Sequence, residues 1–551
     1  MQSKLTSIRS YLVALVPRFW RRRSRQLTEL RKDWASEQEH EAGLDAVAMY
    51  YTAMPKDGQV IDDQTWQDLA MDDVFRKIDR AVAMPGRQVL YARLRFYEAR
   101  EEELAERSRQ YSIFRKEIGL REQIQLQLCR LRVSGMEWVA PLILNPFPRR
   151  PKYVWLLYVL SIASFLCLLG IALYGGLVVP ALLLVLVNAV THVSLSRNLG
   201  PYFRGFSKIA RLLAVAESLS KVKGSEGLPQ SGYLRGVRDK ITLLRRRLAW
   251  FTVDRQSASD LTQAIFEYLN VFFLFDLQLY FRSLPKLEEH RATLIRIFDA
   301  VGSIDAAMAT ASYVEGLKLC STPRLIAARR LETVEMYHPL VRDAVSNSIS
   351  LDARSVLIAG PNMAGKTTFI RTIGINLILA QTLNICLARS GVFPRAVVRS
   401  AIRREDNLLE GESYFYTEIS RIFEFIKEGD NGSLCVFLID EIYRGTNTVE
   451  RIAASASVLR YLAQRQIVLA TTHDQELQGL LIDACEMYHF DDRVLDGQYG
   501  FDYHLRSGPV YSRNAIKLLE LSGYPEAITA EATAMADRLD ASQKKLDQLK
   551  N

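Results

Sequence analysis

The stretch Gly360-Pro361-Asn362-Met363-Ala364-Gly365-Lys366-Thr367-Thr368 decides the fold of the C-terminal part of the chain. It fits the pattern G-x-x-x-x-G-K-[ST], and it stands between an apolar run and a helical pattern, as that motif requires. Glycines let backbone N–H groups wrap around phosphates, and the N-terminus of the following helix adds positive potential. These residues therefore predict a nucleotide-binding loop, in which Lys366 contacts the β- and γ-phosphates and the Thr367 hydroxyl ligates magnesium.

The second motif is an acidic element that follows the loop in the sequence. An apolar run at 434–439 ends in Asp440-Glu441. A strand that ends in an acidic turn is common by itself, but beside a phosphate loop it is typical of a Walker B element. Asp440 is expected to hold magnesium through water, and Glu441 to orient and polarise the attacking water.

A third apolar run, at 467–471, leads through Thr472 to His473. A lone histidine is more often structural than catalytic. This one follows a predicted strand of the same sheet, at the edge where open α/β folds bind their ligands. We therefore predict that His473 senses the γ-phosphate.

The apolar runs also predict the fold class. The runs at 356–359, 434–439 and 467–471 show no polar alternation, which indicates strands buried on both faces of a mostly parallel sheet. The blocks 41–145 and 205–320 have helical periodicity and little strand signal. The sequence predicts an α/β P-loop ATPase domain preceded by an all-α region.

A long apolar segment interrupts the all-α region. No Asp, Glu, Lys or Arg occurs from 153 to 196, about twice the roughly 20 residues that one membrane helix needs. The run breaks at Tyr174-Gly175-Gly176, which predicts membrane helices at about 153–173 and 177–196. The alternative is a helical hairpin buried in a soluble core, but core helices normally keep a polar face.

Basic residues flank this segment on both sides. They are Arg149, Arg150 and Lys152 before it, and Arg197, Arg204 and Lys208 after it. By the positive-inside rule both flanks face the cytoplasm. We therefore expect a bacterial-type inner membrane location, with the C-terminal domain in the cytoplasm.

The remaining composition leaves several partners open. The segment 1–40 is basic with interleaved aromatics, which suits an anionic membrane surface, a disordered tail or a nucleic-acid contact. The net charge of +9 is compatible with nucleic acid or anionic lipid. The six cysteines form no CxxC pair, which argues for a reducing compartment and against a zinc or disulfide framework.

The expected organisation has five parts. They are a basic N-terminal segment at 1–40, a first lever-like helical part at 41–150, a membrane hairpin at 151–198, a second lever-like helical part at 199–330 and an ATPase domain at 331–551.

Taken together, these motifs resemble the MutS family. The resemblance rests on Pro361-Asn362-Met363, Asp440-Glu441-Ile442 with Arg444-Gly445-Thr446, Thr472-His473 with Glu476-Leu477, and Ser413-Tyr414-Phe415-Tyr416-Thr417-Glu418. It implies that Ser413 points at the γ-phosphate of a partner subunit's ATP, and hence a homodimer with composite sites that use ATP and Mg2+. Read alone, Ser413 is also a good helix N-cap.

The resemblance extends more weakly upstream. Met84-Pro85-Gly86-Arg87 resembles the start of the family's helical lever, and Ser303-Ile304-Asp305 resembles its return helix. The departures are the lack of a Phe-x-Glu wedge domain before the lever, a membrane hairpin where the family carries its DNA clamp, and Ala364 in place of a second loop glycine. We therefore expect a shortened, membrane-inserted form without mismatch recognition.

Two functions follow as expectations from this resemblance. The first is a dimeric ATPase that couples its nucleotide state to DNA binding, mainly through phosphate contacts, in a process related to repair or recombination. The alternative is a membrane-bound mechanical ATPase that uses the same MutS-like ATPase domain without binding DNA.

Overall fold

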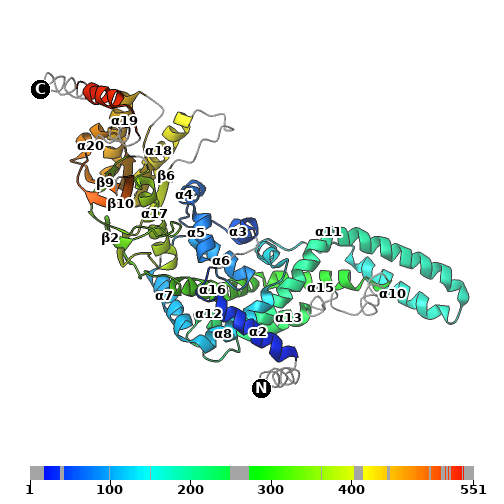
Figure 1. The fold of residues 1–551 in the computed structure, drawn as a ribbon. Helices are drawn as coiled ribbons and strands as arrows, with labels where there is room; N and C mark the ends of the chain where they lie inside the picture. The colour runs from blue at the N-terminus through cyan, green and yellow to red at the C-terminus, as the bar shows by residue number, and fades with distance from the viewer. Residues whose placement is uncertain are drawn as a thin grey trace, which may run out of the picture. The chain divides into compact units, whose positions relative to one another are not determined.

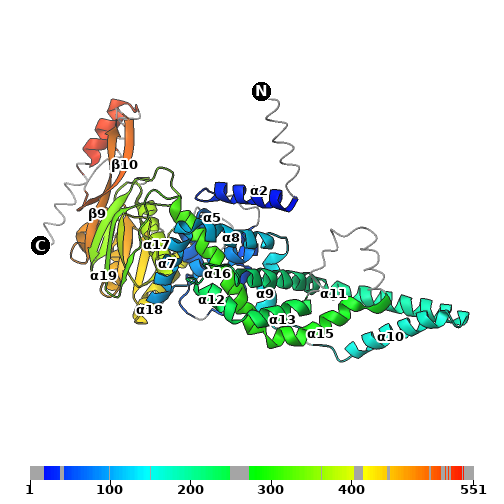
Figure 2. The same cartoon turned by 90° about the horizontal axis from the view of Figure 1, so that it is seen from below.

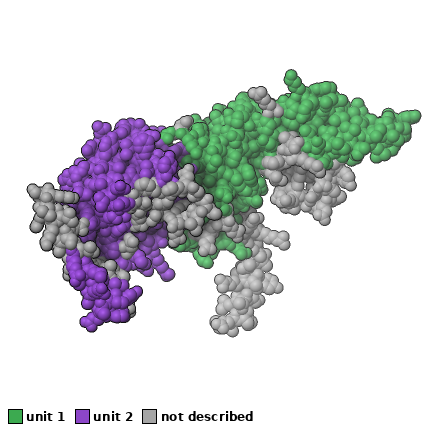
Figure 3. All heavy atoms as spheres, turned by 90° about the horizontal axis from the view of Figure 1, so that it is seen from above, with its two compact units in different colours: residues 1–58, 75–95, 105–317 green, residues 59–74, 96–104, 318–551 purple. Residues whose placement is uncertain are grey.

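The chain forms two compact units (Figure 3). Unit 1 comprises residues 1–58, 75–95 and 105–317, and unit 2 comprises 59–74, 96–104 and 318–551. The short pieces 59–74 and 96–104, which the sequence placed in the first helical part, thus lie in unit 2. The structure is a computed structural model, and it describes residues 18–37, 43–56, 58–98, 100–148, 150–248, 272–361, 363–402, 414–443, 447–495, 498–510, 516, 519, 523–536 and 538.

The described residues of unit 1 form helices, as predicted for the region before the ATPase domain (Figure 1). The helices that lie wholly in it are α2 (Arg18–Asp33), α3 (Leu44–Ala53), α6 (Met84–Arg95), α8 (Ile118–Leu128), η1 (Cys129–Leu131), η2 (Met136–Trp138), α9 (Val139–Leu144), α10 (Val154–Ile171), η3 (Gly175–Leu177), α11 (Val178–Leu219), α12 (Pro229–Gly236), α13 (Arg238–Leu248), α15 (Phe275–Glu289) and α16 (Arg291–Glu315). Two others, α5 (Met71–Ile78) and α7 (Glu101–Lys116), begin in unit 2 and end in unit 1.

The centre of unit 1 is the buried helix α16, which packs on α6. The two segments that resemble the lever start and its return meet here. The Asp305 carboxylate accepts hydrogen bonds from the backbone N–H groups of Val82 and Ala83, at 2.9 and 2.8 Å, just before α6 begins. A Cβ on Gly86 would lie 2.3 Å from Asp305 Oδ2, so only glycine fits there. Burial raises the pKa of Asp305 to about 7.

The apolar segment forms a hairpin of α10 and α11, with α15 packed against both (Figure 2). Val154–Ile171 and Gly175–Leu195 are long and apolar enough to cross a membrane, with mean hydropathies of 2.4 and 2.1. Only 17% and 11% of these spans are buried within the protein. The two helices are thus apolar on surfaces that the rest of the described chain leaves uncovered.

Polar side chains join the hairpin helices in the interior. Asn188 on α11 and Ser164 on α10 are buried, and the Asn188 amide donates to the Ser164 hydroxyl at 2.9 Å. Gln278 on α15 donates to the Ser161 hydroxyl at 2.7 Å. Buried polar groups need such partners, so these contacts fix how the three helices face one another.

The structure corrects two details of the predicted organisation. The apolar span of the second hairpin helix ends at Leu195, close to the expected 196, but the helix continues without a break to Leu219, so the expected boundary at 198 falls inside α11. Part of the basic N-terminal segment, α2, is a helix that packs on α8. Its Leu30 is buried, and the guanidinium of Arg31 pairs with Glu122 at 2.6 Å.

Unit 2 contains the predicted, mostly parallel sheet. Its strand order is β10-β9-β4-β8-β7-β6, and every neighbouring pair is parallel except β10 with β9. The three apolar runs are β4 (Ser355–Ala359), β7 (Cys435–Asp440) and β8 (Ile467–Thr472), which lie side by side with their carboxyl ends at one edge. The prediction of buried parallel strands is therefore confirmed.

Unit 2 contains further strands of this sheet, a second sheet and several helices. A second sheet has the order β1-β5-β2-β3, which the sequence did not reveal. The remaining elements are α4 (Asp63–Asp68), β1 (Arg324–Ile326), β2 (Arg330–Met336), β3 (Asn347–Asp352), α17 (Lys366–Leu383), β5 (Ser390–Pro394), β6 (Val397–Ala401), α18 (Tyr414–Asp430), α19 (Thr448–Ala463), α20 (Gln475–Leu481), β9 (Cys485–Leu495) and β10 (Gln498–Ser507).

The piece 59–74 caps the β6 edge of the main sheet. Asp68, at the end of α4, is buried and accepts hydrogen bonds from the Ser400 hydroxyl at 2.7 Å and from the Ile402 backbone N–H at 3.0 Å. Asp62 accepts one from Arg421 of α18 at 2.9 Å. A segment far away in the sequence is therefore built into the α/β unit, and it holds the sheet edge and α18 together.

Candidate nucleotide-binding site

The glycine-rich loop joins β4 to α17 at the carboxyl edge of the main sheet. Gly360 and Gly365 have φ angles of 140° and 104°, and Met363 has a φ of 70°. L-residues rarely adopt such angles, so the glycines are needed for this path. A Cβ on Gly360 would also lie 2.5 Å from the Phe490 carbonyl oxygen of β9. The loop thus turns tightly and ends in the first turn of α17, where free backbone N–H groups attract anions.

The Lys366 side chain lies folded over this loop. Its ammonium donates hydrogen bonds to the carbonyl oxygens of Gly360 at 2.6 Å and Pro361 at 3.0 Å. It also lies 3.8 Å from Glu441 Oε1, and the side chain is only 4% exposed. A buried cation on the concave side of the loop is placed to meet phosphate oxygens.

Asp440 and Thr367 meet at the end of β7. The Thr367 hydroxyl donates to the two carboxylate oxygens of Asp440 at 3.0 and 2.9 Å, and the Thr471 hydroxyl at the end of β8 donates to the same carboxylate. The alcohol and carboxylate oxygens are the hard ligands that Mg2+ prefers, and Mg2+ usually keeps several waters and takes its other ligands from phosphates. The pair therefore fits magnesium, although the described residues contain no group of three or more His, Cys, Asp or Glu side chains that could hold a metal.

Glu441 follows Asp440 in a strained turn. Its φ of 55° lies in the left-handed region, which non-glycine residues rarely adopt and which is often found at functional sites. The side chain is 7% exposed, and Glu441 Oε2 lies 3.3 Å from Nδ1 of His473. His473, just after β8, is partly exposed. The structure thus brings Lys366, Glu441 and His473 together at the carboxyl ends of β4, β7 and β8.

A cavity of 630 Å³ opens beside the loop, within the size range of small-molecule sites. Its lining includes Lys366, Thr367, Asp440 and Glu441. The sequence did not identify the far wall, which consists of residues brought from distant parts of unit 2: Tyr337, His338, Val341, Arg342, Val345, Asn347, Phe490 and Tyr503.

His338 on this wall carries no charge at neutral pH. Burial, and secondarily Arg371, lowers the pKa of His338 to about 4. Its Nδ1 accepts a hydrogen bond from the Leu340 backbone N–H at 3.2 Å, as a neutral ring can. His338 therefore contributes a neutral aromatic ring to the wall rather than a further cation.

Two predicted site residues, Asn362 and Ser413, lie outside the described residues, as does the segment 444–446. The helix expected to follow Ser413 is present as α18, which begins at Tyr414. Pro361, Met363, Gly365 and Thr368 line the cavity. Ala364 is buried.

The fold and the loop define an α/β protein in which a glycine-rich loop joins a parallel strand to a buried helix. Residues 356–540 match the family described as MutS domain V. Over these residues the chain is therefore similar to the MutS family.

Several curated relatives support this assignment. The chain is 27% identical over 278 residues to the DNA mismatch repair protein MutS of Lactobacillus acidophilus. The aligned region covers 48% of this chain and 32% of that relative. It is 30% identical over 278 residues to that of Chloroflexus aurantiacus (47% and 28%), and 30% identical over 217 residues to that of Thermus aquaticus (38% and 26%). The chain thus spans about a third of the length of the relatives that it matches.

Proposed function

We propose that this chain is a membrane-anchored, MutS-like ATPase that works as a homodimer and couples its nucleotide state to DNA binding. The observation that carries the ATPase proposal is the convergence of Lys366, the Thr367–Asp440 pair and Glu441 at one edge of a parallel sheet. Similarity to the MutS family supports the same reading, because members of that family are ATPases.

Each of these residues has its own role in binding ATP and Mg2+ or in hydrolysis. Lys366 would leave the carbonyls of Gly360 and Pro361 and bind the β- and γ-phosphate oxygens. Thr367 and Asp440 would hold Mg2+, which neutralises phosphate charge. Glu441 would orient and polarise a water molecule for attack on the γ-phosphate, with His473 positioned beside it. Ser413 of the partner subunit completes the site in this proposal.

We propose DNA binding because the matched relatives are named DNA mismatch repair proteins. Since the match covers about a third of those relatives, we carry over DNA binding but not mismatch recognition. The net charge of +9 suits contacts with phosphates. The second candidate, a membrane-bound mechanical ATPase without DNA, is favoured by the apolar hairpin, which is the clearest addition to the family's pattern.

A DNA titration separates the two candidates. Detergent-solubilised full-length protein is titrated with labelled matched, mismatched and branched duplexes at several salt concentrations, with ADP and with ATP. We expect binding at low salt that weakens steeply with salt, little preference for a mismatch, and different affinities with ADP and ATP. A mismatch preference of about tenfold, roughly 1.4 kcal/mol, would contradict this. No DNA binding with either nucleotide would favour the mechanical ATPase.

Membrane anchoring is tested separately. The surfaces of α10 and of the first half of α11 are apolar and exposed, which is costly in water but favourable in lipid. We expect the protein to sediment with membranes and to resist carbonate washing. Reporter fusions at Arg150, Gly175 and Asn551 should report cytoplasm, opposite side and cytoplasm. Release of intact protein by carbonate would instead support a soluble hairpin.

A further inference from the structure

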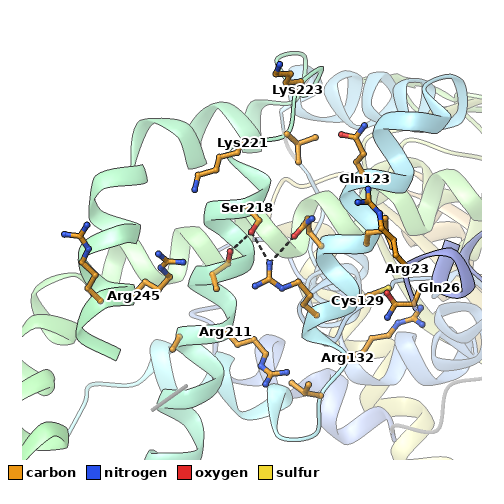
Figure 4. Close-up of a pocket in the computed structure, with 18 residues that line it drawn as sticks. Arg23, Gln26, Gln123, Cys129, Arg132, Arg211, Ser218, Lys221, Lys223 and Arg245 are labelled. Carbon is orange, nitrogen blue, oxygen red and sulfur yellow. Dashed lines mark hydrogen bonds between the residues drawn. The ribbon is translucent and has the colours of Figure 1, made fainter. Parts of the chain in front are cut away.

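Unit 1 contains a large pocket of its own. It has a volume of about 1350 Å³ and is framed by four segments (Figure 4). They are α2, the α8–η1 segment up to Val133, the C-terminal part of α11 with the following turn, and α13. All of these segments lie within unit 1, so the pocket is independent of the nucleotide site.

The lining of this pocket is strongly basic. None of its residues is acidic, and eight of them are basic: Arg23, Arg130, Arg132, Arg211, Lys221, Lys223, Arg245 and Arg246. Glu217 forms ion pairs with two of these cations, 2.7 Å from Lys221 and 3.1 Å from Arg245. The lining itself therefore presents eight cationic side chains and no carboxylate to the pocket.

Neutral groups hold the innermost cations in place. Arg130 donates to Gln127 Oε1 at 3.1 Å and to the Ser218 hydroxyl at 3.0 Å (Figure 4). Arg132 donates to the Val82 carbonyl at 2.9 Å. Burial, and secondarily the charges of Arg211 and Arg245, lower the pKa of Arg130. Its charged form is therefore disfavoured by desolvation and by repulsion from the neighbouring cations. An anion bound here would relieve that repulsion without requiring the arginines to be reoriented.

We propose that this pocket binds a compact anion that carries two or more phosphate groups. Several guanidinium and ammonium groups converge on one concavity, and guanidinium groups match phosphate oxygens in pairs. The lining contains no aromatic residue on which a nucleic-acid base could stack, as single-strand binding sites normally provide. The ligand is therefore recognised by its phosphates.

The same chemistry occurs in a free polyphosphate and in a diphosphate lipid headgroup. If Gly175–Leu195 crosses the membrane as proposed, Arg211 lies 16 residues beyond the end of that span. At about 1.5 Å per residue, these 16 residues of α11 measure about 24 Å along the helix. The headgroup layer is only about 5–8 Å thick on each side. This distance favours a free anion from the aqueous phase.

The test uses tripolyphosphate and full-length protein in detergent, with magnesium absent. Titration calorimetry is done with the Lys366→Ala variant, so that the glycine-rich loop contributes little binding. We expect one saturable site, weakened about tenfold or more by Arg211→Gln and by Arg246→Gln, neither of which has a carboxylate partner among the described residues. Arg247→Gln is the matched control, since Arg247 is exposed on the same helix but does not line the pocket.

Each contrary result overturns the proposal. Equal weakening by Arg247→Gln would show a general charge effect. Tripolyphosphate binding that occurs in the wild type but not in the Lys366→Ala variant would place the anion at the nucleotide loop. Cardiolipin in mixed micelles and a short oligothymidine are the comparison ligands. If either binds in a way that depends on Arg211 and Arg246 while tripolyphosphate does not bind, the ligand is a lipid or a nucleic acid. Thermal unfolding of each variant shows that the fold is retained.

Discussion

Lys366→Ala should abolish ATP hydrolysis and weaken ATP binding by about 10- to 100-fold, while the protein stays folded. The ammonium is the cation that the loop presents to the β- and γ-phosphates, and a hydrogen bond to a charged group contributes about 1.5–3 kcal/mol. Loss of charge stabilisation in the transition state should lower turnover by at least about 10²- to 10³-fold. Phosphate release and equilibrium binding of labelled ATP measure the two effects.

The matched control for this variant is Lys318→Ala. Lys318 is an exposed lysine of unit 2 that does not line the nucleotide cavity. It should keep wild-type binding and turnover. Full ATPase activity in Lys366→Ala would show that the loop is not the nucleotide site.

Glu441→Gln should separate binding from turnover. Glutamine has the same shape, so ATP should bind with an affinity within a few fold of that of the wild type. Without the carboxylate, no base polarises the attacking water, and general-base catalysis contributes about 10²- to 10⁴-fold. We therefore expect single-turnover hydrolysis to slow by that factor and an ATP-bound dimer to accumulate, which light scattering detects.

Glu424→Gln, an exposed glutamate on α18, is the control for Glu441→Gln and should behave as the wild type. If Glu441→Gln turns over ATP at the normal rate, another group acts as the base. His473, whose Nδ1 lies 3.3 Å from Glu441, would be the next candidate.

The parts of the structure that the sequence predicted correctly depend on local pattern. Runs without polar alternation marked β4, β7 and β8, because strands buried on both faces need apolar side chains on both sides. The order of these strands then placed Lys366, Asp440 and His473 at one sheet edge. The glycine-rich loop gave the start of α17 at Lys366, since its glycines permit the turn before the helix.

The parts that were missed depend on long-range packing. The strands β2 and β3 alternate in burial, are interrupted by a register shift, and carry too little apolar character to stand out. Phe490 and Tyr503 reach the cavity only because the β9–β10 hairpin folds beside β4. The placement of α4 beside β6 brings together residues more than 300 positions apart, such as Asp68 and Ser400. No local sequence pattern predicts such a contact.

The most direct test of the central claim is ATP hydrolysis by the purified wild-type chain, measured as phosphate release with magnesium and again with excess chelator. We expect hydrolysis that requires magnesium, because Thr367 and Asp440 are placed to hold that ion. A Lys366→Ala preparation made in parallel should show none. Hydrolysis at the same rate with chelator or in Lys366→Ala would show that this site does not hydrolyse ATP with magnesium, as would the absence of any hydrolysis in folded wild-type protein.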